Sequence, residues 1–576
     1  MRLTAAEWIA LGAAVAVRVA ALWSVEQTVY ADFPVVDAQT YWQQAQALLS
    51  GEDPFSAGLY QPPGYPSALA ALGWVLGELT LPAVRRLQLL LGVATSVGLL
   101  ALGRRLGTPA GAPWAGAVAV LLYALYPTTL LFEHDLLTPA LTNAALVGAL
   151  LCLLGAPWWK APVAGALSGL AVVCHPTYLL AVGWLGAWRS RQAGGRAALL
   201  GFAVVLGLAL APTTLRNHKD FGTLTLVSHN AGLNFFLGNN PDWRTTAALR
   251  AGIDFRQLVL EAEPHRRDAA ERDAYWKQRA RDGIVSYPVS WASTLAAKSY
   301  WSIHSTEIPR NEDYRCRVEA PSMRWLAWLP VRYGLVFPLA LLGAVRVVRR
   351  REGEGVAVVG AWAMLHLPMI LFLVADRYRL ATWPMVCLLA PLGVVALREL
   401  LAARSVWLVG AAAAAVLPWL PISDTVKKDP AWCLHAQGNM AFVQEEKAEA
   451  LRLYEASLAL DADNLAARTY IASILYQQRR YGPAAEQMEI VLRAFPDHFP
   501  SLNLMSSIQR RMGNLDAAAT YLGRAYAVPG QRRSTGVRYV KLLVEAGRVE
   551  EARQVVREHE ELQRDRRVRE LFSGGR

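Results

Sequence analysis

The stretch YGLVFPLALLGAVRVVRRR, from Tyr333 to Arg351, decides the fold class of this chain. Its apolar part, Tyr333–Val348, contains a single charged residue, and three arginines follow it directly. A helix needs roughly 20 mostly apolar residues to cross the ~30 Å hydrocarbon core of a bilayer. The stretch therefore predicts a membrane-spanning helix, and its arginines indicate a cytoplasmic end because cytoplasmic loops are enriched in Lys and Arg.

Similar apolar runs recur along the chain and predict an all-α, polytopic transmembrane bundle of about eleven spans. The other ten expected spans are Ala5–Leu22, Leu87–Leu102, Trp114–Leu130, Thr138–Leu154, Ala161–Val173, Thr177–Trp188, Ala197–Ala211, Val356–Val374, Ala381–Leu397 and Val406–Trp419. The first could also be a cleaved signal peptide. No small-residue cleavage pattern follows it cleanly, so a retained signal anchor is favoured.

The composition supports this class. Hydrophobic residues make up 54% of the 576 residues and charged residues only 18%, against about 25% charged in a soluble globular chain. This argues against disorder, fibrous repeats and a single soluble enzyme. The net charge of +12 sits largely in short arginine clusters between apolar runs, and no groove-reading motif accompanies it, so no nucleic-acid partner is expected.

The arginine clusters also set the expected topology. With the N-terminus in the cytoplasm, every cluster falls on the cytoplasmic side. Two long segments, 26–82 and 212–331, are then extracytoplasmic loops, and the C-terminus lies outside as well. The sequence thus predicts a multi-pass protein of the inner (plasma) membrane. The two long outside loops are candidates for function, because long ordered insertions between spans are usually functional.

A repeat appears after about Asp429, where the composition becomes that of a soluble protein. Alanines recur every 34 residues, and a larger apolar residue follows each of them by four: Ala450, Ala484, Ala518 and Ala552, with Tyr454, Met488, Leu522 and Val556. This period resembles the tetratricopeptide repeat, a helix pair that buries its apolar face only against its neighbours. An extracytoplasmic α-solenoid over 430–565 is expected, with a groove for peptides or proteins; a plain helical bundle is the alternative.

The first outside loop holds the leading catalytic candidate. Asp37 lies four residues before Tyr41, where a short amphipathic stretch, Tyr41–Leu49, suits a helix lying in the membrane interface. A carboxylate in this place could cap the helix. It could equally serve as a general base at the membrane surface, accepting a proton from a hydroxyl or amide that attacks a sugar carbon.

Several motifs, in their order and sidedness, resemble the GT-C glycosyltransferases over roughly residues 1–420. This superfamily includes protein O-mannosyltransferases and the aminoarabinose transferases of lipid A. The resemblance is closest to bacterial members fused to tetratricopeptide repeats, and it defines a membrane domain over 1–425. The motifs are Asp37 before the loop helix, the turn Tyr60–Pro66 with Tyr65, the acidic Phe132–Asp135, the stretches Leu215–Gly222 and Asn234–Pro241, and the Arg-Tyr-Arg of 377–379. His175 is a departure, because relatives commonly have an arginine there.

The resemblance implies a sugar donor carried on a polyprenyl phosphate and transfer on the outer face of the membrane. Asp37 is then the candidate base. Arg377 and Arg379 are candidates to hold the phosphate, because a guanidinium binds phosphate oxygens at two points. Lys298 is a possible second cation. Interfacial snorkelling or a structural ion pair with Asp376 is the alternative for the arginines, and an ordinary membrane-surface lysine is the alternative for Lys298.

Four further residues are placed near the substrate or a metal: Glu133, Asp135, His175 and Tyr65. Glu133 and Asp135 could hold a divalent cation (Mg or Mn) or sugar hydroxyls, but two acids are too few to specify a metal, and solvated loop residues are the alternative. A packed, hydrogen-bonded histidine is the alternative for His175. Arg18 lies in mid-span, where a charge costs at least ~2.5 kcal/mol, so we expect it to face a partner or a cavity.

The five cysteines divide into two groups. Cys152, Cys174 and Cys387 lie in apolar runs and are expected to be inert core thiols. Cys316 and Cys433 fall outside in the expected topology, where an oxidising compartment would permit a disulfide between them.

Two other functions compete with the glycosyltransferase. The first is a non-catalytic scaffold that recruits envelope proteins through the repeats, although about eleven spans exceed what an anchor needs. The second is a transporter, which the absence of paired Gly/Pro-broken halves argues against.

Overall fold

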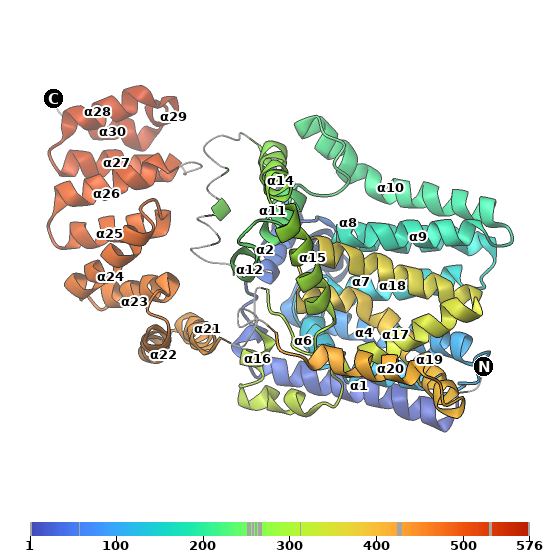
Figure 1. Ribbon diagram of the computed structural model, residues 1–576. Coiled ribbons are helices and arrows are strands. Elements are labelled where there is room, and N and C mark those ends of the chain that lie inside the picture. Colours follow the sequence, from blue (N-terminus) through green and yellow to red (C-terminus); the bar gives the residue numbers. More distant parts are fainter. Residues whose placement is uncertain are drawn as a thin grey trace. The chain divides into compact units, whose positions relative to one another are not determined.

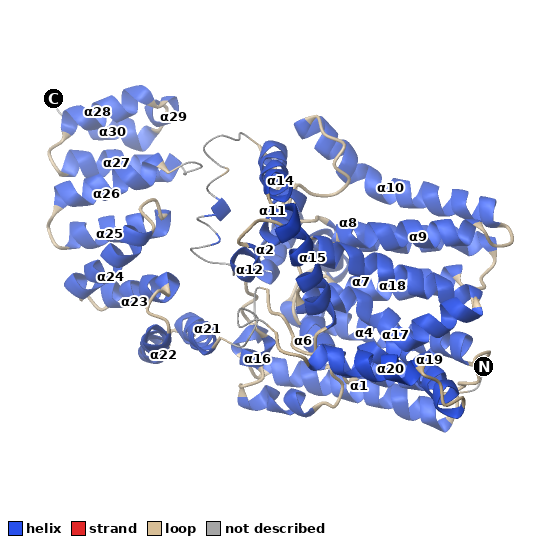
Figure 2. Ribbon diagram, viewed as in Figure 1, coloured by secondary structure: helices blue, strands red, loops and turns tan. Residues whose placement is uncertain are grey.

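We describe the fold from a computed structural model of the 576-residue chain. The described residues run from 3 to 573, apart from 57, 250–254, 256–257, 260–261, 263–267, 311–312, 423–428 and 529–532. Over these residues the chain is built of helices and connecting loops, with no strand (Figure 2). They fall into two compact units, the first from Met1–Leu249 and Arg266–Lys427 and the second from Arg250–His265 and Lys428–Arg576.

The first unit is a bundle of long helices joined by shorter helical segments (Figure 1). Its bundle helices are α1 (Ala5–Glu26), α4 (Leu81–Gly107), α5 (Ala115–Ala124), α6 (Pro127–His134), α7 (Pro139–Leu153), α8 (Ala161–Cys174), α9 (Leu179–Ser190), α10 (Gly195–Phe221), α17 (Tyr333–Arg350), α18 (Gly353–Leu371), α19 (Asp376–Ala402) and α20 (Trp407–Val416). The short 3-10 segments beside them are η1 (Val29–Ala31), η2 (Trp158–Lys160), η3 (Pro176–Tyr178) and η6 (Leu417–Trp419).

Six of the described helices are long and apolar enough to cross a membrane, or seven if α5 and α6 count as one broken span. The expected span Trp114–Leu130 is therefore not a straight helix: α5 and α6 meet at 61°, because Pro127 begins a new helix at its first position and cannot continue the old one. Four more apolar helices have 10–17 residues: Gly64–Leu76, Pro139–Leu153, Trp158–Cys174 and Trp407–Trp419. The sequence predicts about eleven spans, which is more than the six or seven described helices that are long and apolar enough to cross a membrane.

Helix α19 forms the centre of the bundle, and Trp383 at its middle is fully buried. It packs closely on α17 because glycines face the contact from both sides. A Cβ on Gly343 would lie 2.1 Å from the Leu389 carbonyl oxygen, and one on Gly393 would lie 1.8 Å from that of Leu339. Because side chains are absent at these points, the backbones of α17 and α19 approach closely in the second half of α19.

The extracytoplasmic loops expected from the sequence are largely helical. The first holds α2 (Asp37–Leu49) and α3 (Gly64–Leu76), and the rings of Tyr41 and Tyr65 join them edge to face with centroids 5.3 Å apart. The second holds α11 (Ala231–Gly238), α12 (Trp243–Ala248), α14 (Ala269–Ser286), α15 (Pro288–Ile303), α16 (Tyr314–Arg317) and the 3-10 segment η5 (Pro321–Trp328).

The second unit consists of consecutive helix pairs. Its helices are α21 (Pro430–Val443), α22 (Lys447–Leu460), α23 (Leu465–Gln477), α24 (Tyr481–Ala494), α25 (Phe499–Arg511), α26 (Leu515–Ala527), α27 (Arg533–Glu545), α28 (Val549–Glu558), α29 (Glu560–Gln563) and α30 (Arg566–Ser573). The four alanines of the 34-residue period lie on α22, α24, α26 and α28, and each is 0% exposed. The period thus coincides with the second helix of each pair, while the assignment to the tetratricopeptide family stays a prediction.

Three cysteines are free thiols in the described part of the chain. Cys174 and Cys387 are buried and Cys152 is half-buried. The disulfide expected between Cys316 and Cys433 stays a prediction.

Candidate functional site

The site begins at the junction between the first outside loop and α2. Asp37 is the first residue of this helix, and the residue before it, Val36, has a φ of +52°. A β-branched residue rarely adopts this left-handed region, and such backbone strain costs about 1–3 kcal/mol and clusters at functional sites. The strained turn sets the direction in which the Asp37 side chain leaves the helix.

Asp37 contacts Arg377, which lies 340 residues away in the first turn of α19. Nη1 of Arg377 donates to Oδ2 of Asp37 at 2.5 Å, and Nε2 of Gln61 donates to the other carboxylate oxygen at 2.9 Å. Nη2 of Arg377 donates to the Tyr378 hydroxyl at 3.0 Å. The two charged side chains remain 22% and 20% exposed, so solvent or a ligand can reach this ion pair.

Both residues line a pocket that encloses about 670 Å³ when the open space at its mouth is included. Its lining contains four arginines and three aspartates: Arg85, Arg310, Arg317, Arg377, Asp37, Asp135 and Asp376. Its apolar lining residues include Phe33, Pro34, Val35, Val36, Leu131, Phe132, Leu136 and Leu137. Such a pocket suits a ligand that carries an anionic group on an apolar body.

Three of these arginines were not identified from the sequence. Arg85 donates to the carbonyl oxygens of Tyr30, Ala31 and His134 at 2.5, 2.6 and 3.2 Å. Arg310 donates to two carbonyl oxygens of the large loop at 2.9 Å each. Burial lowers the pKa of Arg310. The described hydrogen-bond partners of Arg85 and Arg310 are neutral carbonyls, so both side chains bring positive charge to a pocket wall that also carries Asp37, Asp135 and Asp376.

The two acids predicted from the Phe132–Asp135 motif face different surroundings. Asp135 lines the pocket, where Oδ1 accepts from Nη1 of Arg317 at 2.5 Å. The Arg317 guanidinium lies 4.0 Å from the centre of the Tyr30 ring. Glu133 is buried and pairs with Arg18 inside the bundle, at 2.8 and 3.1 Å. The structure therefore brings Asp135, but not Glu133, to the pocket that holds Asp37.

His175 and Tyr65 lie beside the pocket and are not among the residues that line it. The His175 ring meets the Tyr378 ring edge to face at 5.7 Å, and its Nδ1 lies 2.6 Å from the Thr177 hydroxyl. Burial, together with the Arg377 charge, lowers the pKa of His175 to about 4, so it is neutral at pH 7. Tyr65 is 2% exposed and packs on Tyr41.

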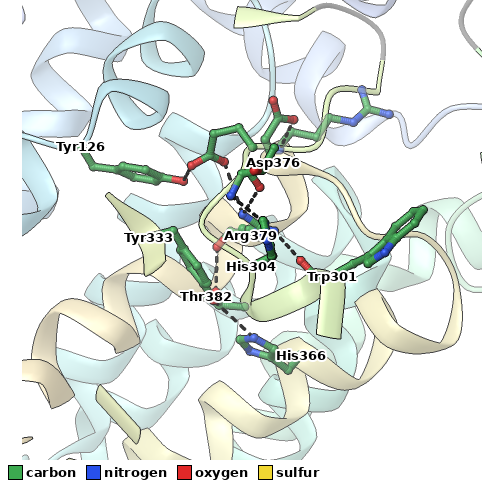
Figure 3. A network of polar contacts seen from close by, with 11 residues as sticks. Tyr126, Trp301, His304, Tyr333, His366, Asp376, Arg379 and Thr382 are labelled. Atoms are coloured by element: carbon green, nitrogen blue, oxygen red, sulfur yellow. Dashed lines mark hydrogen bonds and ion pairs between the residues drawn. The ribbon is translucent and has the colours of Figure 1, made fainter. Parts of the chain in front are cut away.

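Lys298 and Arg379, the other two predicted phosphate ligands, also lie outside the pocket lining. Both are buried, at 1% and 0% exposure. Nζ of Lys298 donates to Gly238, Asn239, Leu371 and Phe372 oxygens at 2.9–3.3 Å. Arg379 sits in a polar network with Tyr126, Trp301, Tyr333 and Thr382 (Figure 3). Of the three predicted cations, Arg377 alone is brought to Asp37.

The residues of the pocket do not fit a divalent cation well. Asp37 and Asp135 each accept from an arginine, and guanidinium groups lie where a metal would need further oxygen ligands. Over the described residues, no group of three or more His, Cys, Asp or Glu could hold a metal ion. The sequence-based possibility of Mg or Mn therefore finds no ligand set here, and we derive no step through a metal.

No protein-family model and no curated protein matches this sequence. Among solved structures, the chain is similar to the oligosaccharyltransferase of Archaeoglobus fulgidus in the apo form, at 14% identity and a TM-score of 0.37, over 74% of this chain and 58% of that one. It is also similar to the same enzyme tethered with an acceptor peptide containing the NVT sequon, at 14% identity and a TM-score of 0.38, over 77% and 59%. The chain spans about three-fifths of the length of these structures, and likeness at this level is too weak to place it in a family.

Proposed function

We propose that this protein is a membrane glycosyltransferase of the GT-C type. It transfers a sugar from a polyprenyl-phosphate-linked donor to a protein or other envelope acceptor on the extracytoplasmic face of the membrane. The observation that carries the proposal is the contact between Asp37 and Arg377, two residues remote in sequence, in a pocket lined by arginines and apolar residues. The resemblance of the surrounding sequence motifs to GT-C enzymes supports the same function.

The lining of the pocket offers contacts for both parts of the donor. Its apolar residues, among them Phe33, Leu131 and Phe132, suit the first isoprene units of the lipid. Its four arginines outnumber its three aspartates, which leaves an excess of positive charge for a phosphate. A guanidinium binds phosphate oxygens in a planar, two-point geometry, and stabilising charge that develops on a leaving phosphate is often the largest catalytic contribution.

The reaction is a displacement at the anomeric carbon of the sugar. An acceptor oxygen or nitrogen forms a bond to this carbon while the bond from the carbon to the phosphate oxygen breaks. Asp37 takes the proton from the acceptor, and the polyprenyl phosphate leaves with the electron pair of the broken bond, held by Arg377. In a single displacement the configuration at the sugar carbon is inverted.

The ion pair between Asp37 and Arg377 then represents the resting state of the site. A phosphate that binds Arg377 competes with the Asp37 carboxylate for the same guanidinium protons. Binding of the donor therefore releases Asp37 from this partner, and its lone pairs become available for the acceptor proton. Gln61, which donates to the other carboxylate oxygen, keeps the side chain in place during the exchange.

In this proposal the second unit binds the acceptor or a partner protein. Its helix pairs bury the alanines of the 34-residue period completely, as a stack of tetratricopeptide repeats would. Such solenoids present concave surfaces to peptides and proteins. We assign this unit to the binding of a protein acceptor or partner outside the membrane.

Replacing Arg377 with Ala tests the donor site. We expect the affinity for a polyprenyl phosphate to fall roughly 10- to 100-fold, because charge-assisted hydrogen bonds contribute ~1.5–3 kcal/mol. Binding of undecaprenyl phosphate in detergent, measured by native mass spectrometry, gives this value without requiring turnover. Arg86→Ala is the matched control, since Arg86 follows Arg85 on α4 but is exposed. Equal affinity for Arg377→Ala and wild type would remove Arg377 from the site.

The wild-type protein tests the function itself. Purified protein is incubated with polyprenyl-phosphate-linked sugars that carry a label in the sugar, together with envelope proteins as acceptors. Transfer of label to protein supports the proposal. If polyprenyl phosphate does not bind and no sugar is transferred from any donor, the alternative gains support: a non-catalytic scaffold that uses the helix pairs to recruit envelope proteins.

A further inference from the structure

The turn that leads into α19 carries Arg377. Hydrogen bonds hold this turn both before and after Arg377 in the sequence. It runs from the end of α18 at Leu371 to the first turn of α19. Its attachments go to α15 and the loop that follows it, residues 298–308, and to Asn239 at the end of α11. Between them, the backbone N–H of Asp376 donates to the Ile308 carbonyl oxygen at 2.8 Å.

Lys298 fastens the turn on the side that precedes Arg377. Its ammonium donates to the carbonyl oxygens of Leu371 and Phe372 at 3.3 and 3.2 Å, and to Gly238 and Asn239 oxygens on the large loop at 2.9 and 3.2 Å. Nδ2 of Asn239 also donates to the Leu371 carbonyl oxygen at 2.6 Å. The buried Lys298 side chain thus links α11, α15 and the end of α18. Without its donors, the carbonyl oxygens at the end of α18 would lose hydrogen bonds, and a buried acceptor without a donor is costly.

Arg379 fastens the turn on the side that follows Arg377 (Figure 3). Its guanidinium donates to the carbonyl oxygens of Thr306, at 3.1 Å, and Trp301. It also forms an ion pair with Glu307 at 3.6 Å, whose other carboxylate oxygen accepts from the Tyr126 hydroxyl at 2.6 Å. The guanidinium is enclosed by protein on all sides, at 0% exposure, so a phosphate in the pocket cannot reach it without displacing these contacts.

We infer that Lys298 and Arg379 are positioning residues, which hold the α18–α19 turn so that Arg377 contacts Asp37 in the pocket. This inference rests on the proposed function in so far as the ligand of Arg377 is a phosphate. Arg377 stands between the two attachments, five residues after Phe372 and two before Arg379. A misplacement of about 1 Å in a binding group can cost about 100-fold in rate, so these remote contacts matter to the site although neither side chain touches it.

A double-mutant cycle separates positioning from general support of the fold. We expect Lys298→Met to raise the KM for the donor about tenfold, in the range of coupling between residues that share a network. In the Arg377→Ala background we expect the same substitution to change this KM less than about twofold, because the residue it positions is already absent. Full multiplication of the two effects would overturn the inference.

Conservative substitutions of Arg379 and Lys298, and a control substitution of an exposed lysine, accompany the double-mutant cycle. Arg379→Lys keeps the positive charge but loses the planar fork that reaches two carbonyls, and it gives the same test if Lys298→Met fails to fold. Lys298→Arg retains donors for the same oxygens and is expected to recover part of the lost donor affinity. Lys541→Met, an exposed lysine of the second unit, should leave the donor KM at its wild-type value.

A second measurement does not depend on catalysis. The coupling free energy between Asp37 and Arg377 is obtained from the unfolding of Asp37→Asn, Arg377→Met and the double variant in detergent. We expect this coupling to fall at least twofold when Lys298→Met is also present. A decrease without any sugar transfer by the wild type would leave the positioning intact and reject the function. Unchanged coupling would reject the positioning whatever the function is.

Discussion

Replacing Asp37 with Asn is expected to lower the rate of sugar transfer by about 10²–10⁴-fold, the usual contribution of a positioned general base. The amide retains the size of the carboxylate but cannot accept the proton of the attacking group. Binding of the donor should remain or become tighter, because Arg377 no longer has a carboxylate competing with the phosphate. The expected signature is a loss in kcat with an unchanged or lower KM for the donor.

The measurement is the initial rate of transfer from a labelled polyprenyl-phosphate sugar by protein that is folded and inserted. Asp32→Asn is the matched control, because Asp32 lies five residues upstream in the same loop, is exposed, and does not line the pocket. Its rate should equal that of the wild type. Full activity of Asp37→Asn would show that another group accepts the proton, and the proposed mechanism would be wrong.

The class of fold, and Asp37 as a candidate, could be predicted from local sequence, whereas Arg377 is a candidate only through the resemblance of its Arg-Tyr-Arg motif to that of GT-C glycosyltransferases. Apolar length indicates spans, and an aspartate at the start of an amphipathic loop helix stands out in an otherwise apolar chain. The three other arginines of the pocket could not be found in this way. Arg85 lies inside the span helix α4 and Arg310 and Arg317 in the large loop, and which of many arginines face one pocket depends on how the helices pack.

The same dependence separates Arg377 from Arg379. Both belong to one Arg-Tyr-Arg motif, and residues two apart on a helix point in different directions because each residue turns the helix by about 100°. Arg377 therefore reaches the pocket while Arg379 turns towards Trp301 and Tyr333. A sequence motif gives the residue types but not this direction. For Lys298 the sequence leaves a phosphate-binding cation and an ordinary membrane-surface lysine open, whereas in the structure its side chain is buried and donates to the Gly238 and Phe372 carbonyl oxygens.

For the mid-span Arg18, the energetic cost of a charge in the membrane leads to the expectation that its side chain faces a partner or a cavity. A guanidinium in the hydrocarbon region is costly without a counter-charge. The structure provides Glu133, whose two carboxylate oxygens accept from Nε and Nη2 of Arg18, while Nη1 donates to the Ala14 carbonyl oxygen at 3.0 Å. Gly92 makes room for the pair, since a Cβ there would lie 2.6 Å from Nε of Arg18.

Replacing Glu133 with Ala is accordingly expected to lower the free energy of unfolding by about 3–5 kcal/mol, the usual cost of leaving one member of a buried ion pair without its partner. The substitution removes the counter-charge and keeps the guanidinium at 0% exposure. The matched control is Glu354→Ala, which breaks the exposed pair with Arg105, whose side chains are 30% and 43% exposed. That pair should contribute no more than ~1 kcal/mol.

The double replacement of Arg18 and Glu133 by Leu decides between a structural and a functional reason for this pair. Two apolar side chains remove both charges, so most of the lost stability should return, because buried ion pairs are often no more stable than well-packed apolar residues. The unfolding free energy in detergent and the rate of sugar transfer are measured on the same preparations. If stability returns and transfer stays at the wild-type rate, the pair serves the bundle alone. A stable double variant without transfer would instead show that the pair positions the pocket wall, because α6, which carries Glu133, continues directly into Asp135 in the pocket lining.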